Sequence, residues 1–285
     1  MTILDGKKIA ADIRARVKAE VAALGRLPAG RHGTPGLGVV LVGTDPASHT
    51  YVRLKEKACA EVGIRFERTL IPAAAAQDDV LAAVRAYNDR ADIDAVLVQL
   101  PLPDGMDENA VIAAMDPAKD VDGFHPDNLK RFLAGEPIVT PVIVNGLLQL
   151  IAATGIPLPG ARAAVFANST IFAEPLRVAL EARGMHVTTS LGKNLADTAP
   201  TVAGADVVIV AVGKPAYVRA KDCKDGAVLI DVGTNWLPDG SYVGDVDAEG
   251  AEAKPGWLTP VPGGVGPVTV AALTENVVAL NRARH

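Results

Sequence analysis

Short apolar runs alternate along this chain with segments of helical periodicity, and no other feature of the sequence restricts the fold as much. The apolar runs are rich in β-branched residues and are bounded by Gly, Pro or Asp, which predicts strands buried on both faces. We expect such strands at residues 37–43, 93–100, 163–167, 206–212 and 227–232, with weaker ones at 65–70 and 185–189. Helices are expected at residues 5–24, 46–62, 77–88, 107–114, 142–153, 175–182, 194–203 and 268–281.

This alternation predicts an α/β fold, in which helices cover both faces of parallel sheets. The length of 285 residues is enough for one large or two ordinary domains. The Pro-containing segment 135–141 is the best candidate for a border between two domains. We expect the last helix of the chain to return to the first domain.

Composition and charge exclude several classes of protein. The formal charge is -5 and no long basic run occurs, which argues against an extended nucleic-acid interface. Cys59 and Cys223 each stand alone, so we expect neither a disulfide framework nor a zinc site, and a reducing cytoplasm fits. The first residues carry Asp5, Lys7 and Lys8 and resemble no signal peptide. No apolar stretch approaches the roughly 20 residues that cross a bilayer.

The helix expected after the first strand carries a candidate site. Tyr51 and Lys55 are four residues apart and share one face, with Ser48 near the helix start. Gln99 ends another strand, and ligands of open α/β sheets bind beyond the carboxyl ends of strands. One interpretation is therefore that a ring, an amine and a carboxamide converge on one cleft. The alternative, favoured on spacing alone, is a solvated lysine and a glutamine that caps a strand end.

Residues 119–126 (KDVDGFHP) form a second candidate, in which two acids, a glycine and a histidine share a loop. Asp122 could accept hydrogen bonds from an amino-heterocycle. The alternative is a turn held by Asx-type hydrogen bonds, and it is favoured if nothing else supports a site. His125 has no partner at metal-ligand spacing, so we expect a structural role for it and no metal site.

Residues 259–267 (TPVPGGVGP) contain three glycines and three prolines, which predicts a constrained loop. Glycine allows a backbone to approach a ligand closely. The alternative is a plain turn, although a tight Gly/Pro loop directly before a helix is an unusual choice for one.

Together these segments resemble the bifunctional methylenetetrahydrofolate dehydrogenase/methenyltetrahydrofolate cyclohydrolase (FolD) family over nearly the whole chain. The resemblance implies a folate-binding catalytic domain, residues 1–139 plus 268–285, and a Rossmann-like domain, residues 140–267, with a cleft between them. It also implies a homodimer. The matching strings are PASHTYVRLKEKA (46–58), VQLPLP (98–103), KDVDGFHP (119–126), VAVGKP (210–215), DVGTN (231–235), VGDV (243–246) and TPVPGGVGPVT (259–269).

The resemblance implies two reactions on a tetrahydrofolate derivative: hydride transfer from methylene-tetrahydrofolate to NADP, then hydrolysis of the methenyl product to formyl-tetrahydrofolate. It implies that Lys55 is the catalytic lysine, that Gln99 orients it and that Asp122 holds the pterin. Tyr51 would stack on the folate. Further substrate contacts are implied for Ser48, Val98, Leu100, Pro101, Pro262, Gly263 and Gly264. Dinucleotide contacts are implied for Asn168, Ser169, Thr170, Ser190, Val212, Gly213 and Thr234.

The chain departs from the family where the dinucleotide binds. The family pattern G-R/A-S-x-x-V-G-x-P has alanine here in place of both glycines, at Ala167 and Ala173. Asn168 replaces the phosphate-facing arginine, and Glu174 adds a negative charge near the helix start. We expect two methyl groups to stand where backbone approaches pyrophosphate, and Glu174 to repel phosphate or fill the site.

In addition, no acid ends the strand before Ser190 to hold an NAD ribose. The changes in the dinucleotide segment predict that NADP binds weakly or not at all. A separate departure is Ile143, which stands where the family has glycine, near the expected domain border, and predicts a cleft of altered shape. The alternatives are therefore a bifunctional enzyme, a cyclohydrolase or otherwise specialised folate enzyme that has lost NADP binding, and a non-catalytic folate-binding paralogue. Retention of Lys55 and Gln99 argues against the last one, because binding alone needs no reactive amine.

Overall fold

The computed structural model describes residues 1–25, 33–192 and 198–285 and contains two compact units. The three-stranded unit contains residues 11–143 and 270–285, and the six-stranded unit contains residues 1–10 and 144–269. These ranges differ from the predicted domains mainly in the first ten residues. The reason is strand β1 (Thr2–Ile3), which pairs with β13 (Trp257–Leu258) at the edge of the six-stranded sheet.

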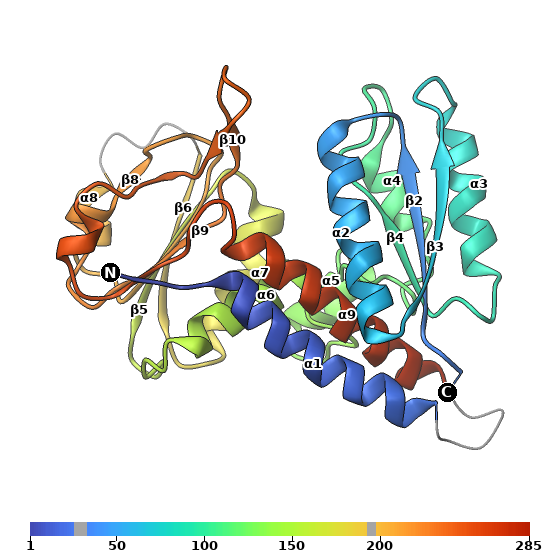
Figure 1. Ribbon diagram of the computed structural model, residues 1–285, viewed down its shortest axis with the longest axis horizontal. Coiled ribbons are helices and arrows are strands. Elements are labelled where there is room, and N and C mark those ends of the chain that lie inside the picture. Colours follow the sequence, from blue (N-terminus) through green and yellow to red (C-terminus); the bar gives the residue numbers. More distant parts are fainter. Residues whose placement is uncertain (26–32, 193–197) are drawn as a thin grey trace. The chain divides into compact units, whose positions relative to one another are not determined.

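The three-stranded unit is built on a parallel sheet in the order β3-β2-β4. Helices α2 (Pro46–Val62) and α3 (Gln77–Asn88) lie on opposite sides of this sheet (Figure 1). Every residue of the central strand is buried, as the sequence predicted. The strands are β2 (Gly36–Val42), β3 (Arg65–Ile71) and β4 (Ala95–Val98), and the other helices are α4 (Glu108–Ala113), α5 (Pro126–Leu133), most of α1 (Gly6–Leu24) and most of α9 (Val265–Arg284).

Helix α2, which carries the first candidate site, begins and ends by local rules. The Asp45 carboxylate accepts a hydrogen bond from the Ser48 amide at 2.7 Å, and Pro46 occupies the first turn. Gly63 ends the helix with φ +85°, a conformation that glycine adopts without strain. The predicted bounds of this helix are confirmed. The positions of Tyr51 and Lys55 on one helix face therefore follow from their spacing in the sequence.

The six-stranded unit has a fully parallel sheet in the order β1-β13-β9-β7-β5-β6. Strand β6 lies on one side of β5 and β7 lies on the other, so the chain reverses direction across the sheet at β5. The carboxyl ends of β5 and β7 are therefore a topological switch point, the usual place for a ligand in such sheets. The bounds are β5 (Arg162–Ala167), β6 (His186–Leu191), β7 (Val207–Ala211), β9 (Val228–Asp231), α6 (Val142–Ala153), α7 (Thr170–Glu181) and α8 (Ala199–Val202).

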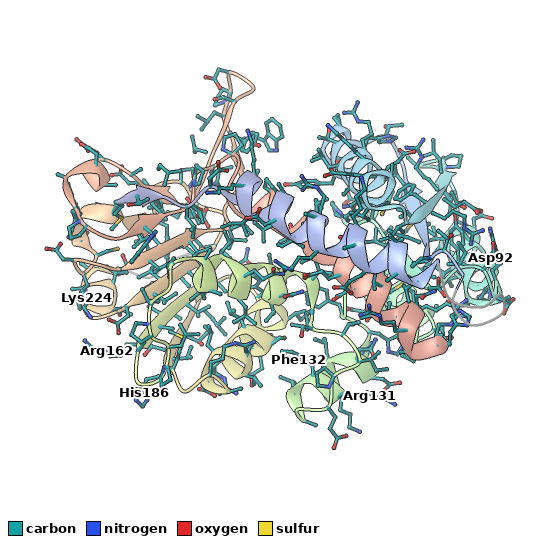
Figure 2. The ribbon with its side chains drawn as sticks, turned by 60° about the horizontal axis from the view of Figure 1, so that its bottom comes forward. Asp92, Arg131, Phe132, Arg162, His186 and Lys224 are labelled. Carbon is teal, nitrogen blue, oxygen red and sulfur yellow. The ribbon has the colours of Figure 1, made fainter. Side chains whose placement is uncertain are left out.

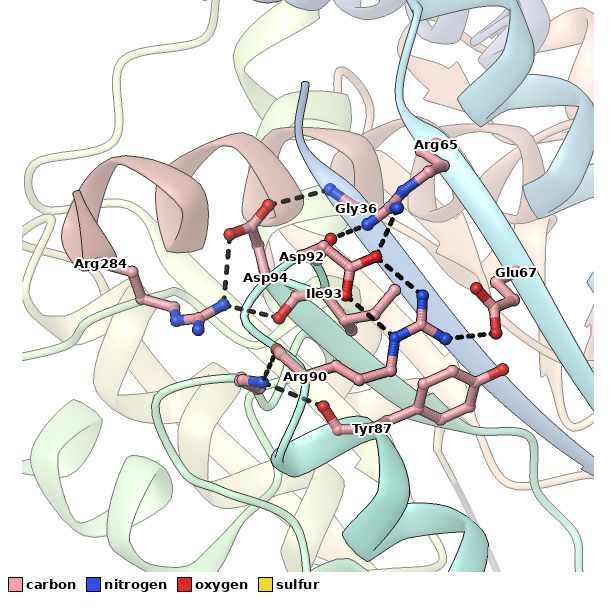
Figure 3. A network of polar contacts seen from close by, with 10 residues as sticks. Gly36, Arg65, Glu67, Tyr87, Arg90, Asp92, Ile93, Asp94 and Arg284 are labelled. Carbon is pink, nitrogen blue, oxygen red and sulfur yellow. Dashed lines mark hydrogen bonds and ion pairs between the residues drawn. The ribbon is translucent and has the colours of Figure 1, made fainter. Parts of the chain in front are cut away.

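The amino edges of both sheets are occupied by polar contacts of the protein itself. In the six-stranded unit the Asp206 carboxylate accepts from the Arg162 amide at 2.8 Å and forms an ion pair with Lys224. Arg162, His186 and Lys224 lie at this end of the sheet in Figure 2. In the three-stranded unit the buried Asp94 accepts from the Gly36 amide and from Arg284 of α9 (Figure 3). Ligands of open α/β sheets bind at the opposite edge, beyond the carboxyl ends of the strands.

Several elements differ from those expected. Helix α7 begins at Thr170 instead of residue 175, because the Ser169 hydroxyl caps it and Pro175 is accommodated inside the helix. Helix α9 begins at Val265, three residues before the expected start. Part of the helix expected at residues 194–203 lies outside the described residues. Helix α5 and the two-residue strands were not predicted; these include β8 (Val218–Arg219) with β12 (Val246–Asp247) and β10 (Asn235–Trp236) with β11 (Tyr242–Val243).

Candidate functional site

A lysine and a glutamine meet at the carboxyl edge of the three-stranded sheet. Lys55 of α2 donates from Nζ to Oε1 of Gln99, which follows β4, at 2.8 Å. The glutamine is held in turn, because its backbone amide donates to Val40 and its side-chain nitrogen donates to the Leu100 carbonyl. The carboxamide oxygen is therefore directed at the amine, and the two groups form one unit.

Partial burial perturbs the charges of this unit. Withdrawal of the Lys55 amine from water lowers its pKa below the ordinary value, although the nearby Asp122 carboxylate partly opposes this shift. Burial raises the pKa of Asp122, and the charge of Lys55 opposes that shift in turn. The structure thus brings Lys55, Gln99 and Asp122 together, and it gives Lys55 a larger neutral fraction than a solvated lysine has.

The loop of residues 119–126 is held by its other acid. The buried Asp120 carboxylate accepts from the Gly123 amide at 3.1 Å, the His125 amide at 2.7 Å and Asn128 Nδ2 at 3.0 Å. Asx-type hydrogen bonds of this kind were the alternative interpretation of the loop. In the structure Asp120 makes them. Asp122 contributes its backbone carbonyl to the Val142 amide, and its carboxylate makes no such turn bond among the described contacts.

His125 has a structural role as the cap of helix α5. Its ring Nδ1 accepts from the Asp127 amide at 3.1 Å and caps α5. Across residues 1–25, 33–192 and 198–285, no group of three or more His, Cys, Asp or Glu side chains could hold a metal ion. Within the same ranges, no helix is long and apolar enough to span a membrane.

The other predicted substrate contacts of this unit differ in accessibility. Tyr51 is 40% exposed and Leu100 and Pro101 are also exposed, so these side chains are open to a ligand. Ser48 and Val98 are buried, Ser48 inside the first turn of α2. Tyr51 precedes Lys55 by one helical turn and Leu100 directly follows Gln99, so an accessible ring and an accessible aliphatic side chain neighbour the pair along the chain.

The glycine- and proline-rich loop belongs to the six-stranded unit and packs tightly. A side chain on Gly6, at the start of α1, would overlap the Gly264 carbonyl, and one on Gly264 would meet the Pro260 carbonyl. Gly263 has φ +107°, and Pro262 beside it is exposed. The Thr259 hydroxyl accepts from the Asp231 amide at 2.8 Å. Glycine is required at the first two of these positions by lack of space, so the predicted constrained loop is confirmed.

The switch point of the six-stranded sheet gathers the predicted dinucleotide residues. Asn168 follows β5 and its amide donates to Ala211 at the end of β7, while Ser169 caps α7. Asn168, Thr170, Gly213 and Thr234 are exposed, Ser190 is half-buried and Val212 is buried. The start of a helix stands here beside the ends of two parallel strands, which is the arrangement that binds pyrophosphate in dinucleotide folds.

The expected obstruction of this place by two methyl groups is wrong. Ala167 is 0% exposed and Ala173 is 2% exposed, so both methyl groups fill space inside the protein. The expected filling by Glu174 is also wrong, because its carboxylate is bound to Arg177 at 2.6 Å on the outer surface of α7. That pairing lowers the pKa of Glu174 and offsets its charge. The described residues therefore fit a dinucleotide.

Two family models match this chain, and together they cover most of it. Residues 4–122 match the catalytic domain of tetrahydrofolate dehydrogenase/cyclohydrolase, and residues 141–285 match the NAD(P)-binding domain of the same proteins. The chain belongs to the tetrahydrofolate dehydrogenase/cyclohydrolase family. The resemblance drawn from the sequence is confirmed, and so is a two-domain α/β fold with a Rossmann-like sheet.

Individual family members are similar over their whole length. The chain is 45% identical over 283 residues to the bifunctional protein FolD of Acidiphilium cryptum, covering 99% of both chains. It is 46% identical over 280 residues to the bifunctional protein FolD of Moorella thermoacetica, covering 98% of each. The FolD structure of Campylobacter jejuni superposes with a TM-score of 0.91 at 36% identity, with 100% of both chains covered. The Trypanosoma brucei FolD structure, complexed with NADP and an inhibitor, gives 0.92 at 34% identity and covers 99% of this chain and 98% of that one.

Some contacts of the site were beyond sequence reasoning. Lys119 and Asp120 were seen only as part of a loop string, yet they are buried and fix that loop. Asp231 and Asp245 were quoted only within matching strings, and both are buried acceptors near the switch point. For the last two acids the matching strings held a partial signal, because Gly244 leaves room for the Asp231 carboxylate and Gly233 leaves room for the Asp245 carboxylate.

Proposed function

We propose that this member of the family hydrolyses methenyl-tetrahydrofolate to formyl-tetrahydrofolate and oxidises methylene-tetrahydrofolate with a nicotinamide dinucleotide. The observation that carries the proposal is the 2.8 Å hydrogen bond from Lys55 to Gln99, in a setting that lowers the pKa of the amine. A general base at neutral pH needs a neutral fraction, and burial supplies it. Tyr51 and Leu100 would bind the flat pterin, and Asp122 its amino-heterocycle.

The hydrolytic step balances with Lys55 as the base. Water adds to the cationic methenyl carbon and loses one proton to the neutral amine, while Gln99 keeps the amine in place. The carbon–nitrogen bond of the resulting carbinol then breaks, the hydroxyl becomes the formyl carbonyl, and the released nitrogen gains the hydroxyl proton. Lys55 returns its proton to solvent. A cationic substrate beside the amine favours its neutral form further.

For the oxidation, the bound dinucleotide supplies the hydride acceptor. In this chain the helix start at Ser169 and Thr170 would hold its pyrophosphate, and the residues after β7 would hold its other half. Support comes from the buried methyl groups of Ala167 and Ala173, which leave the helix start accessible. The NADP complex of the Trypanosoma brucei relative, similar over 99% of this chain, adds to that support.

We further propose that this chain discriminates weakly between NADP and NAD. Asn168 is exposed at the switch point in place of an arginine, whose planar fork is suited to a phosphate group. Strand β6 ends in Ser190 and Leu191, so no acid stands there to favour a free ribose. Calorimetric titration with each dinucleotide tests this, and a preference above tenfold for either one contradicts it.

The substitution Asn168→Arg sharpens the same point. We expect it to tighten NADP binding about tenfold, the value of a charge-assisted hydrogen bond at an exposed position, and to leave NAD unchanged. An equal gain for both dinucleotides indicates general charge attraction and contradicts the assignment of Asn168 to the phosphate. If wild type binds neither dinucleotide, the chain is a cyclohydrolase only, the second candidate function.

The hydrolytic activity is tested by following consumption of methenyl-tetrahydrofolate with purified protein. Lys55→Met should remove the activity, whereas Lys57→Met, an exposed lysine two residues along the same helix, should keep it. If wild type is inactive but binds the folate, the chain is the non-catalytic paralogue. Normal turnover by Lys55→Met removes the assigned base.

We also propose a homodimer in a reducing cytoplasm. Both cysteines, Cys59 and Cys223, are buried free thiols, which supports a compartment that needs no disulfides. Light scattering should give about twice the chain mass of 29.5 kDa. A mass of one chain at micromolar concentration contradicts the dimer.

A further inference from the structure

Asp245 is a buried acid that no step proposed above uses. It is 0% exposed, and its carboxylate accepts four N–H groups. Three of them are consecutive backbone amides just after β7, from Val212 at 2.7 Å, Gly213 at 2.9 Å and Lys214 at 2.8 Å. The fourth is Nδ2 of Asn235 at 2.8 Å. Successive amides that converge in this way form a nest, a common place for an anion, and here the anion is the protein's own carboxylate.

A second buried acid holds Asp245 in place. Asp231, at the end of β9, accepts from the Asp245 amide at 2.9 Å and from the Val246 amide at 2.9 Å. A side chain on Gly244 would overlap the Asp231 carboxylate, and one on Gly233 would overlap the Asp245 carboxylate. The strings DVGTN (231–235) and VGDV (243–246) therefore pack against each other, and we call this unit the brace. Through the Asp245 carboxylate, the brace holds the loop after β7.

The brace fixes the direction of three peptide groups. In a trans peptide the N–H and the C=O point in opposite directions. Because the amides of Val212, Gly213 and Lys214 point at Asp245, the carbonyls of Ala211, Val212 and Gly213 point away from it. Two of these carbonyls accept from Asn168, that of Ala211 from its backbone amide at 3.3 Å and that of Val212 from its side chain at 3.5 Å. The carbonyls are thus turned to the switch-point side of the loop.

We propose that Asp245 is a positioning residue for the dinucleotide. By filling the amide nest, it turns the carbonyls after β7, above all that of the exposed Gly213, toward hydrogen-bond donors of the cofactor. The matching donors are hydroxyl groups of a ribose or the N–H groups of a carboxamide, both of which a nicotinamide dinucleotide carries. The inference rests on the proposed function and adds to it a residue that acts through the loop without touching the cofactor.

The test is Asp245→Asn, which keeps the size of the side chain but places an NH₂ group against amide donors. We expect the dissociation constants of NADP and NAD to rise at least tenfold in calorimetry. We expect hydrolysis of methenyl-tetrahydrofolate, which needs no dinucleotide, to stay within twofold of wild type. Amide hydrogen exchange at residues 212–214 should accelerate in the same variant.

Two control variants separate positioning from loss of stability. Asp247→Asn changes a carboxylate two residues further along the chain that accepts from Glu249 instead of from the loop, and should leave affinity unchanged. Ala164→Gly removes a buried methyl group from the middle of β5 in the same sheet, so it should lower the unfolding temperature without weakening dinucleotide binding. If Ala164→Gly weakens binding as much as Asp245→Asn does, the role of Asp245 is only structural and the proposal is overturned.

If Asp245→Asn does not fold, Asn235→Ala decides, because it removes one donor to the carboxylate and adds none. A loss of affinity of threefold or more with hydrolysis retained supports the proposal, and unchanged affinity overturns it. Wild-type affinity in a folded Asp245→Asn protein overturns this inference alone. Failure of wild type to bind either dinucleotide removes both this inference and the proposed oxidation, and leaves the hydrolysis standing.

Discussion

Two lysines of the three-stranded unit, Lys55 and Lys119, are alike in charge and in the effect of burial, which lowers the pKa of both amines. Their partners differ. Lys119 is 1% exposed and donates to three backbone carbonyls, of Tyr87 at 3.0 Å, Asn88 at 2.6 Å and Arg90 at 2.7 Å. For Lys55 one hydrogen bond is found among the described contacts, to the neutral carboxamide of Gln99.

The surroundings of Lys119 explain why its amine donates three hydrogen bonds. Its acceptors lie at the end of α3 and just beyond it, where helix carbonyls have no partner within the helix. Arg90 also forms ion pairs with Asp92 at 2.8 Å and with Glu67 at 2.5 Å (Figure 3). Lys119 therefore terminates a helix in a region rich in fixed partners. The comparison teaches that the number of fixed acceptors, more than burial, separates the structural lysine from the one that we propose as the base.

The largest expected effect is on turnover in Lys55→Met. Loss of the base should lower the rate of hydrolysis by roughly 10²- to 10⁴-fold, the range for general acid–base groups. The free energy of unfolding should change by less than about 1 kcal/mol, because methionine fills similar space, Gln99 can form a hydrogen bond with water, and the Lys55 charge that favours ionised Asp122 is itself disfavoured by burial. Kinetics and urea unfolding on one preparation measure both. A large loss of stability would make Lys55 resemble Lys119 and would break the comparison.

Lys119→Met should show the reverse pattern. Three backbone carbonyls lose their donor, so the free energy of unfolding should fall by about 3 kcal/mol. The molecules that remain folded should hydrolyse the substrate at a rate within a few-fold of wild type. The assay is run below the urea transition, at a concentration of folded protein fixed by circular dichroism. A hundredfold fall in turnover per folded molecule would mean that the loop of residues 119–126 acts in the chemistry.

The smallest effect is a shift in pH dependence for Gln99→Glu. In the proposed mechanism the neutral amine is the base, so we expect hydrolysis to fall as pH decreases through the pKa of Lys55. A carboxylate at residue 99 stabilises the charged amine and raises that pKa, which should move the acidic limb upward by about one pH unit. The substitution keeps the size of the side chain and gives the Lys55 amine a charged, fixed partner in place of a neutral one. Rate profiles of both proteins at saturating substrate give the shift, and an unmoved limb would assign it to another group.

The sequence predicted the long elements of the fold well, for a physical reason. Strands β2, β5 and β7 are buried on both faces and form continuous apolar runs, which is the strongest signal a strand gives. The two-residue strands, such as β1, carry no period and depend on pairing with distant segments. The predicted start of α7 at Pro175 was wrong, because a proline more often begins a helix than lies inside one.

The candidate site was predictable where it lies on regular structure. Tyr51 and Lys55 share a helix face by spacing, and Gln99 ends a strand, so their edge of the sheet followed from the sequence. Asp120 and Asp122 are two residues apart in a loop without a period, so no pattern tells which one turns inward. The methyl groups of Ala167 and Ala173 were misjudged for a similar reason, since a motif gives residue type but not the direction of a side chain.

Each unit carries one buried thiol, Cys59 in α2 one turn after Lys55, and Cys223 in the six-stranded unit. Burial raises the pKa of both thiols to about 12, so neither reacts with an alkylating reagent while its surroundings stay closed. The rate of alkylation at each cysteine therefore reports how often its own unit opens. The native chain thus carries two probes of local opening, Cys59 near Lys55 and Cys223 in the six-stranded unit. Their alkylation rates can be compared with folate, with NADP or with both present.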